Sequence, residues 1–188
     1  MDSRSKDTVR DLAVASRSAR STEDIRFADV ALAAHDWGKL CPGSLVTCFM
    51  SMPSEPPTSA LRETLLRLGK QIALPIMQPG RQLAWGFDGG EFVANNFGIY
   101  EPAPAEVDIA KASAIIIPAL RVGLDGMRLG RGAGYYDRAL SMIPLHSAGG
   151  PIRICLVFDE DVFETVPHES HDEPIDVIVT PTEVLQIN

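Results

Sequence analysis

The feature that most limits how this chain can fold is a nearly continuous apolar run, Ala114-Ile115-Ile116-Ile117-Pro118. Strands of this kind are typical of parallel sheets, where both faces are buried. An earlier apolar run at 45–50 is followed by a proline-rich loop, a helix that opens at Thr58 and a second strand at 72–76. Strand, helix and strand in this order form the unit from which parallel sheets are built. The sequence therefore predicts an α/β fold with a mainly parallel sheet.

The remaining segments extend this prediction along the chain. We expect a strand at 83–87, a helix at 135–142, a buried strand at 152–158 and a last strand at 175–179. Apolar positions at helical spacing predict two helices within residues 1–40, with Ser21 as the N-cap of the second. With 188 residues and no repeats or long linker, the chain is expected to form one three-layer α/β domain spanning 1–188. Helices should cover both faces of the sheet, and the N-terminal helices should pack on the α/β core.

Charge and cysteine content limit the classes of partner. The formal net charge of -8 does not supply the basic face that a nucleic-acid backbone requires. Three cysteines without C-x-x-C spacing do not describe a disulfide framework, which indicates a reducing compartment. No segment has the roughly 20 apolar residues of a membrane span, and the first residues lack the apolar core of a signal peptide. We therefore expect a cytoplasmic monomer that binds small molecules, with no nucleic-acid or membrane partner.

The strongest chemical signal is the segment 128–138, Arg-Leu-Gly-Arg-Gly-Ala-Gly-Tyr-Tyr-Asp-Arg. Glycines at alternate positions expose backbone N–H groups just before a helix, whose positive end attracts an anion. The arginines add forked donors for phosphate oxygens. Glycine-rich segments are often only turns, and this one matches neither the Walker loop nor the dinucleotide fingerprint. We interpret it as a phosphate-binding loop and keep an ordinary turn as the alternative.

This segment and four other blocks resemble the 5-formyltetrahydrofolate cyclo-ligase family. The five blocks occur in the family's order and extend over nearly the whole chain. They are Lys6-x-x-x-Arg10, Phe49-Met50-Ser51-x-x-x-Glu55-x-x-Thr58, Gly98-Ile99-Tyr100-Glu101-Pro102, Ile117-Pro118 with Arg128-Leu129-Gly130-x-Gly132-x-Gly134-Tyr135-Tyr136-Asp137, and Pro167-x-x-x-His171-Asp172. We also expect a fold related to sugar-phosphate isomerases and CoA transferases, although a shared fold carries no function by itself.

The resemblance implies a reaction in which 5-formyltetrahydrofolate and MgATP give 5,10-methenyltetrahydrofolate, ADP and phosphate. In the family's mechanism the formyl oxygen attacks the γ-phosphorus, and a neighbouring nitrogen then closes the ring and expels phosphate. Phosphoryl transfer of this kind needs positioning and charge cancellation rather than a nucleophilic side chain. The expected co-substrate is ATP and the expected metal is Mg²⁺.

The resemblance also assigns roles to individual residues. The implied ATP-binding residues are Lys6, Arg10, Arg128, Leu129, Gly130, Arg131, Gly132, Ala133, Gly134, Tyr135 and Tyr136. The implied folate-binding residues are Met50, Glu55, Arg131, Gly132, Ala133, Gly134 and Tyr135. Arg131 is expected to be catalytic, and Asp137 and Asp172 are expected to hold Mg²⁺.

Most of these assignments have a plainer structural alternative. Lys6 and Arg10 could lie on a solvated helix face, and an aspartate in a first helical turn often only compensates the helix dipole. Met50 could belong to the core, and only one of Tyr135 and Tyr136 need face the ligand.

Two weaker candidates concern aromatic and histidine residues. From their polarity and position, Trp85 and Phe97 are candidates for the lining of the pterin or benzoyl region. His168 and His171 are three residues apart, but the absence of a nearby cysteine or an H-E-x-x-H motif disfavours a zinc site.

Two other functions remain as alternatives. An enzyme of the same fold acting on a sugar phosphate or a CoA thioester would need a general base or a nucleophilic glutamate, which the sequence does not identify. A non-catalytic folate- or nucleotide-binding module would not need a metal opposite the γ-phosphate. The basic residues and aspartates named above therefore favour the ligase.

Overall fold

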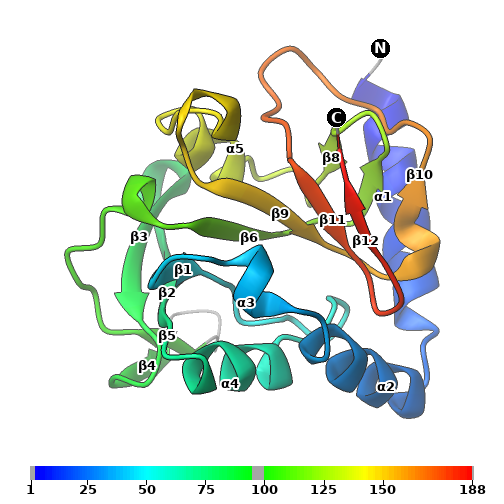
Figure 1. The fold of residues 1–188 in the computed structure, drawn as a ribbon. Coiled ribbons are helices and arrows are strands. Elements are labelled where there is room, and N and C mark those ends of the chain that lie inside the picture. Colours follow the sequence, from blue (N-terminus) through cyan, green and yellow to red (C-terminus); the bar gives the residue numbers. More distant parts are fainter. Residues whose placement is uncertain (1–2, 95–99, 188) are drawn as a thin grey trace.

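A seven-stranded sheet forms the centre of the computed structural model, which describes residues 3–94 and 100–187 (Figure 1). In spatial order its strands are β12 (Val184–Gln186), β11 (Val177–Val179), β9 (Ile152–Leu156), β6 (Ala114–Pro118), β1 (Leu45–Thr47), β2 (Gln71–Gln78) and β3 (Gln82–Phe87). The five inner strands run parallel, and β3 and β12 are antiparallel edge strands. The mainly parallel sheet is confirmed, with the apolar run 114–118 at its middle.

Side chains of β6 alternate between two cores, because successive residues of a strand point to opposite faces. Ala114 and Ile116 belong to the first core, and Ile115 and Ile117 belong to the second. All four are at most 1% exposed. Burial on both faces explains why this strand is apolar throughout.

Three helices cover the first face, namely α2 (Thr22–Ala33), α3 (Trp37–Leu40) and α4 (Ser59–Arg67). Their residues Leu32, Trp37 and Leu61 are fully or almost fully buried in the first core. Ser21 caps α2 through a reciprocal capping box with Asp24, which confirms the predicted N-cap.

The second face carries one short helix, α5 (Tyr135–Leu140), together with a small sheet. The strands of that sheet are β10 (Val162–Phe163), β7 (Arg121–Gly123) and β8 (Arg128–Leu129). Leu140 and Val122 pack in the second core. The prediction of helices on both faces is therefore confirmed, but among the described α-helices only α5 packs in the second core. The short strands β10, β7 and β8 complete this layer, and they are too short to produce an alternating pattern in the sequence.

Several boundaries differ from the sequence prediction. The strand expected at 45–50 ends at Thr47, the helix expected at 135–142 ends at Leu140, and the strand expected at 152–158 ends at Leu156. Past the two strands the apolar pattern continues because Cys48, Phe49, Val157 and Phe158 remain buried in loops. Past the helix, Ser141 and Met142 are exposed, so the helical spacing there does not reflect burial. Single-turn helices occur at η1 (Pro79–Arg81), η2 (Ile109–Lys111), η3 (His146–Ala148) and η4 (Asp159–Asp161).

Outside the main sheet, β4 (Phe92–Ala94) pairs with β5 (Tyr100–Pro102). Phe97 and the first two positions of the block 98–102 lie outside the described residues. The first helix, α1 (Ser3–Ser18), runs beside β10 (Figure 1).

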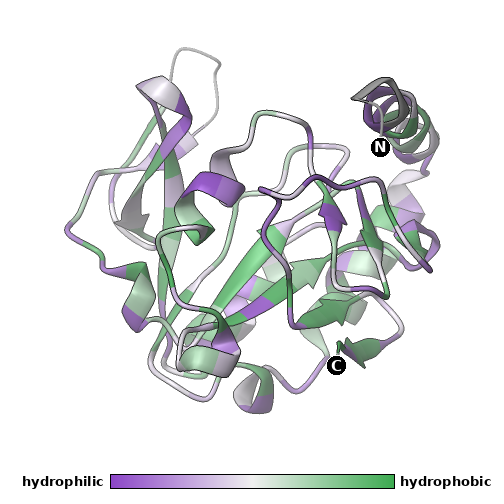
Figure 2. Ribbon diagram, turned by 90° about the horizontal axis from the view of Figure 1, so that it is seen from above, coloured by the Kyte–Doolittle hydropathy of each residue, from purple (hydrophilic) through white to green (hydrophobic). Residues whose placement is uncertain are grey.

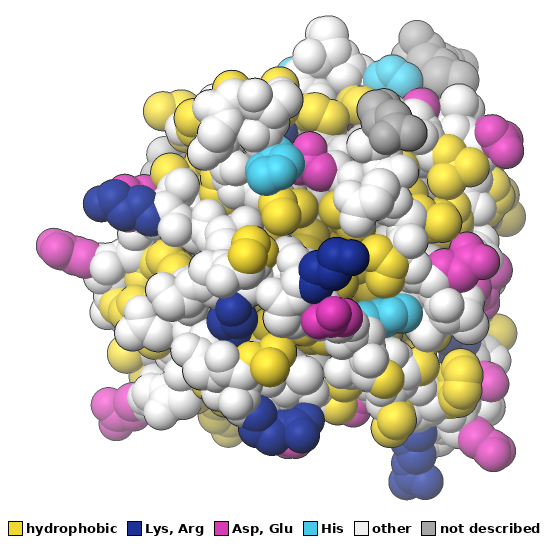
Figure 3. Space-filling model, in the orientation of Figure 1, with side chains coloured by type: hydrophobic (Ala, Val, Ile, Leu, Met, Phe, Trp, Pro, Cys, Tyr) yellow, Lys and Arg dark blue, Asp and Glu magenta, His cyan; other side chains and the backbone are white. Residues whose placement is uncertain are grey.

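Hydropathy follows these layers: the central strands are largely hydrophobic and the surrounding loops more hydrophilic (Figure 2). On the face in Figure 3, acidic, basic and apolar side chains are interspersed. Among the described residues, no helix has the length and apolar character needed to cross a membrane.

Candidate active site

A cavity of about 400 Å³ opens at the carboxyl ends of the parallel strands. Ligands of parallel α/β proteins bind at this edge, and the volume is in the range of small-molecule sites. All the residues to which the family resemblance gave a role in binding ATP, folate or metal line this cavity, namely Lys6, Arg10, Met50, Glu55, the whole run 128–137 and Asp172. The chain thus brings together blocks that are far apart in sequence.

The glycine loop, defined as residues 130–134, connects β8 to α5. Gly132 and Gly134 have φ values of 91° and 72°, a region that residues with a Cβ rarely adopt. A Cβ on Gly132 would also lie 3.1 Å from the guanidinium carbon of Arg10, whereas one on Gly130 would meet nothing within 4 Å. Two of the three glycines are therefore required by backbone conformation, and one of these also by close approach.

Helix α1 contributes two cations to the cavity. The Arg10 Nε donates to the carbonyl oxygen of Gly130 at 3.1 Å, which ties α1 to the glycine loop. The Lys6 ammonium lies 2.6 Å from an Asp172 carboxylate oxygen and 3.1 Å from a Glu169 oxygen. Lys6 is only 7% exposed, so the solvated-face alternative is wrong for this residue.

Two members of the cluster formed by Lys6, Glu169, His171 and Asp172 have shifted pKa values, namely Lys6 and Asp172. Partial burial opposes the charge of Lys6, but hydrogen bonds to Asp172 and Glu169 outweigh it and raise the lysine pKa above its ordinary value. Partial burial also opposes the charge of Asp172, yet the hydrogen bonds from Lys6 and the Glu169 amide outweigh it and lower the Asp172 pKa. Ligand atoms of Glu169, His171 and Asp172 lie within 4.8 Å of one another.

Asp137 has different partners from Asp172. Its Oδ1 accepts hydrogen bonds from Arg128 Nη2 at 2.6 Å and from the Glu173 amide at 3.2 Å. Arg128 is buried and also donates to the Glu173 carbonyl oxygen. Among the described residues, the compact acidic cluster contains Asp172 but not Asp137, although Asp137 contacts the residue that follows Asp172 in the chain.

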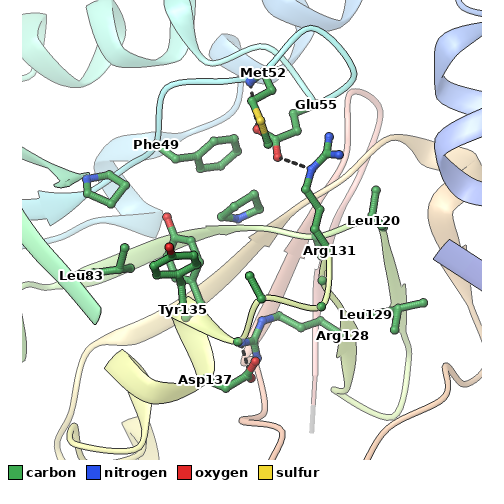
Figure 4. A pocket seen from close by; sticks show the side chains of 18 of the residues that line it. Phe49, Met52, Glu55, Leu83, Leu120, Arg128, Leu129, Arg131, Tyr135 and Asp137 are labelled. Carbon is green, nitrogen blue, oxygen red and sulfur yellow. Dashed lines mark hydrogen bonds and ion pairs between the residues drawn. The ribbon is translucent and has the colours of Figure 1, made fainter. Parts of the chain in front are cut away.

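An ion pair joins the glycine loop to the opposite side of the cavity. Arg131 Nε lies 3.2 Å from Glu55 Oε1, and Arg131 Nη2 donates to Ser54 Oγ at 2.6 Å. Glu55 is 7% exposed and also accepts the amide of Met52 at 2.9 Å. Figure 4 shows Arg131 reaching from the loop toward Glu55. The predicted catalytic arginine and the predicted folate-binding acid are therefore direct partners.

The comparison with known proteins decides the family. Residues 2–181 match the profile of the 5-formyltetrahydrofolate cyclo-ligase family. This chain belongs to that family. It is 36% identical over 193 residues to the 5-formyltetrahydrofolate cyclo-ligase of Mycolicibacterium smegmatis, with 96% of each chain covered.

Other cyclo-ligases and their structures agree with this assignment. The Escherichia coli cyclo-ligase is 32% identical over 146 residues, with 74% of this chain and 79% of that protein covered. The 5,10-methenyltetrahydrofolate synthetase of Aquifex aeolicus superimposes with a TM-score of 0.80 at 24% identity, covering 97% of this chain and 92% of that one. This structural likeness establishes the fold alone.

The tyrosines of this cyclo-ligase family member differ in environment. Tyr136 packs against the second core, and its hydroxyl is buried without a hydrogen-bond partner among the described residues. Burial raises the pKa of Tyr136 well above its ordinary value. Tyr135 also lines the cavity and begins α5. Of the two, Tyr135 is the better candidate to face a ligand.

Sequence reasoning missed most of the apolar lining of the cyclo-ligase cavity. The missed residues are Phe49, Met52, Pro75, Met77, Leu83, Tyr100 and Leu120. Several follow or end strands β1, β2 and β6, and that position at the carboxyl ends is the signal that could have identified them. Met50 packs on the first core, as its structural alternative proposed, and it also lines the cavity, where its contact with folate stays a prediction.

The prediction that Trp85 lines the folate region of the cavity is wrong. Trp85 is 6% exposed and does not line the cavity. Its position on β3, paired with Pro75 of β2, buries the ring instead.

Proposed function

We propose that this protein converts 5-formyltetrahydrofolate to 5,10-methenyltetrahydrofolate, using ATP and releasing ADP and phosphate. The observation that carries the proposal is the cavity, in which residues from five separate blocks of a cyclo-ligase family sequence meet. The relatives named above bear the names of enzymes with this activity. Residues 1–188 are proposed to act as one domain and as a monomer in the cytoplasm, where buried free thiols stay reduced.

ATP is proposed to bind between α1 and the glycine loop. Lys6, Arg10 and Arg128 supply positive charge on one side, and the backbone N–H groups of 130–134 supply donors on the other. Arg10 contacts Gly130 directly, which places charge and loop within reach of the same phosphate group. Phosphoryl transfer in this arrangement needs no tyrosine or cysteine side chain as nucleophile.

Magnesium is proposed to bind through the carboxylates of Asp172 and Asp137. Carboxylate oxygens suit a hard cation, and the Asp172 carboxyl has a lowered pKa and is therefore ionised at neutral pH. Glu169 offers a further oxygen within the same cluster. The bound ion would neutralise charge on the phosphate oxygens. Lys6 now pairs with Asp172 and Glu169, and phosphate binding would give this ammonium a third anionic partner.

Folate is proposed to occupy the apolar side of the cavity. The Glu55 carboxylate suits the amino and ring N–H donors of a pterin, while Met50 and Phe49 provide apolar contact. Because Glu55 pairs with Arg131, folate and phosphate would each compete for one partner of this ion pair. The folate and the ATP phosphates are therefore proposed to lie next to each other at Arg131.

The proposed reaction has two steps. The formyl oxygen first forms a bond to the γ-phosphorus of ATP while the bond from that phosphorus to the β-phosphate oxygen breaks, and ADP leaves. The neighbouring nitrogen then donates its electron pair to the activated formyl carbon and loses its proton, while the carbon–oxygen bond breaks and phosphate leaves. Arg131 is proposed to stabilise the charge on the transferring phosphoryl group, an electrostatic role that needs no nucleophilic side chain.

An oxygen-18 label in the formyl group tests this route. The wild-type protein is incubated with labelled 5-formyltetrahydrofolate, ATP and Mg²⁺, and the released phosphate is analysed by mass spectrometry. The proposal predicts one labelled oxygen in each phosphate. Cyclised folate accompanied by unlabelled phosphate would contradict the proposed route.

A further inference from the structure

Arg17 is a fully buried cation that the function described so far does not use. Its side chain is 0% exposed, and its carboxylate partner Asp161 is 3% exposed. The guanidinium donates to Asp161 Oδ2 at 2.9 Å, to the carbonyl oxygens of Ala119 at 2.7 Å and Leu120 at 2.9 Å, and to that of Ser54 at 3.4 Å. One side chain of α1 thus holds three other segments of the chain.

The held segments form walls of the cavity. Ala119 and Leu120 line it directly, and the Leu120 amide donates to the Leu129 carbonyl oxygen at 2.8 Å, just before the glycine loop. Ser54 accepts a hydrogen bond from Arg131 and precedes Glu55. Arg17 therefore connects the wall that carries Glu55 to the wall that leads into the glycine loop.

Helix geometry extends this connection to the cations of α1. Arg10 and Arg17 are seven residues apart, close to two helical turns, so they project from similar sides of α1. Arg10 contacts the glycine loop at Gly130, and Lys6 lies one further turn toward the N-terminus. The contacts of Arg17 fix α1, and they therefore determine the positions of Lys6 and Arg10 relative to the Glu55 loop and the glycine loop.

A contribution to folding stability does not readily explain why Arg17 and Asp161 are buried as a charged pair. Burial lowers the pKa of Arg17 and raises that of Asp161 despite their mutual attraction. Buried ion pairs replaced together by apolar residues of similar volume are often neutral or stabilising. Only a planar fork with five donors can bind a carboxylate and three carbonyl groups at once.

We propose that Arg17 is a positioning residue for the ligase reaction, which sets the spacing between the α1 cations, the Glu55 loop and the glycine loop. This inference rests on the proposed function. Arg17 does not line the cavity, and its effect is exerted through the carbonyl groups to which it donates. Displacements of about 1 Å can cost roughly a hundredfold in rate when two reactants must be aligned.

The test uses a double variant that removes both buried charges, Arg17→Met with Asp161→Leu. The matched control is Arg62→Met with Asp88→Leu, an ion pair with two contacts of 2.7 Å that does not line the cavity. The Asp88 amide bonds to Ile72, near the start of β2 and thus at the opposite end of the sheet. Thermal unfolding, kcat, KM for each substrate and amide hydrogen exchange are measured for both.

We expect the Arg17 double variant to melt within a few degrees of the wild type, to lose roughly a hundredfold in kcat and to change KM much less. Amide exchange should accelerate in 51–58, in 119–131 and around Asp161, which are the segments that Arg17 contacts. The control should keep the wild-type kcat and the wild-type exchange in these segments. Arg17→Lys, which keeps the charge but lacks the fork, should also have a reduced kcat.

Two results would overturn the inference. One is a folded double variant with the wild-type kcat, and the other is an equal loss of kcat in the control. If the double variant does not fold, wild-type turnover in Arg17→Lys would overturn it instead. An inactive wild type would refute the proposed function, and the exchange rates in 51–58 and 119–131 would still decide whether Arg17 fixes the two walls.

Discussion

Replacing the glycines of the loop one at a time should give three different results, although the three residues look alike in sequence. Gly132 has φ of 91°, and a Cβ there would lie 3.1 Å from the Arg10 guanidinium carbon. Gly134 has φ of 72° with nothing within 4 Å, and Gly130 has neither a positive φ nor a near neighbour. The structure therefore separates backbone strain from steric contact.

The expected magnitudes follow from these two terms. Strain at a positive φ costs on the order of 1–3 kcal/mol, so Gly134→Ala should be destabilised by about that amount. Gly132→Ala adds displacement of Arg10 and should be destabilised more. Gly130→Ala should be neutral or stabilised by roughly 0.4–1 kcal/mol, because alanine restricts the unfolded chain. In a protein of this size, 1 kcal/mol corresponds to about 2–4 °C in Tm.

The assay is thermal and urea unfolding of the ligand-free variants, followed by kcat/KM for ATP. Gly132→Ala should have the lowest Tm and a reduced kcat/KM for ATP, because Arg10 loses its contact with the Gly130 carbonyl group. Equal Tm values for Gly132→Ala and Gly130→Ala would show that neither the positive φ nor the contact with Arg10 makes Gly132 necessary.

Three further predictions concern charged residues of the cavity. Arg131→Ala or Asp137→Ala is expected to abolish turnover while circular dichroism shows the fold retained, and undiminished activity of Arg131→Ala would show that the loop is misassigned. Because the pKa of Asp172 is lowered by folding, its contribution to stability is full above about pH 4 and is lost as pH falls through the folded pKa. The unfolding free energy of Asp172→Asn should therefore vary less below about pH 4 than that of the wild type, and equal pH dependence would contradict this. Glu55→Gln should raise KM for the folate more than KM for ATP, and steady-state kinetics with an unchanged folate KM would exclude Glu55 as its partner.

The sequence predicts the sheet well because its signals are local. Residues 114–118 are apolar at every position, and only a central strand buried on both faces requires that pattern. The glycine loop is also visible in the sequence, because its alternate glycines are accompanied by arginines and directly precede a predicted helix. The expected relationship to sugar-phosphate isomerases and CoA transferases stays a prediction.

The pairing of charges could not be predicted, because it joins residues far apart in the chain. Arg131 and Glu55 are 76 positions apart, and Lys6 and Asp172 are 166 apart. A single sequence has no local pattern that reports such contacts. Arg17 is a clear example: in a basic helix it looks like a solvated residue, yet it is among the most buried side chains described.

The central claim is that this protein closes the folate ring at the expense of ATP. The most direct measurement is the near-ultraviolet absorbance of 5,10-methenyltetrahydrofolate after the purified protein is mixed with 5-formyltetrahydrofolate, ATP and Mg²⁺, with controls that omit each component. We expect a rise in absorbance that requires all three components. No rise, with the folate nevertheless bound to the protein, would contradict it and favour a binding module.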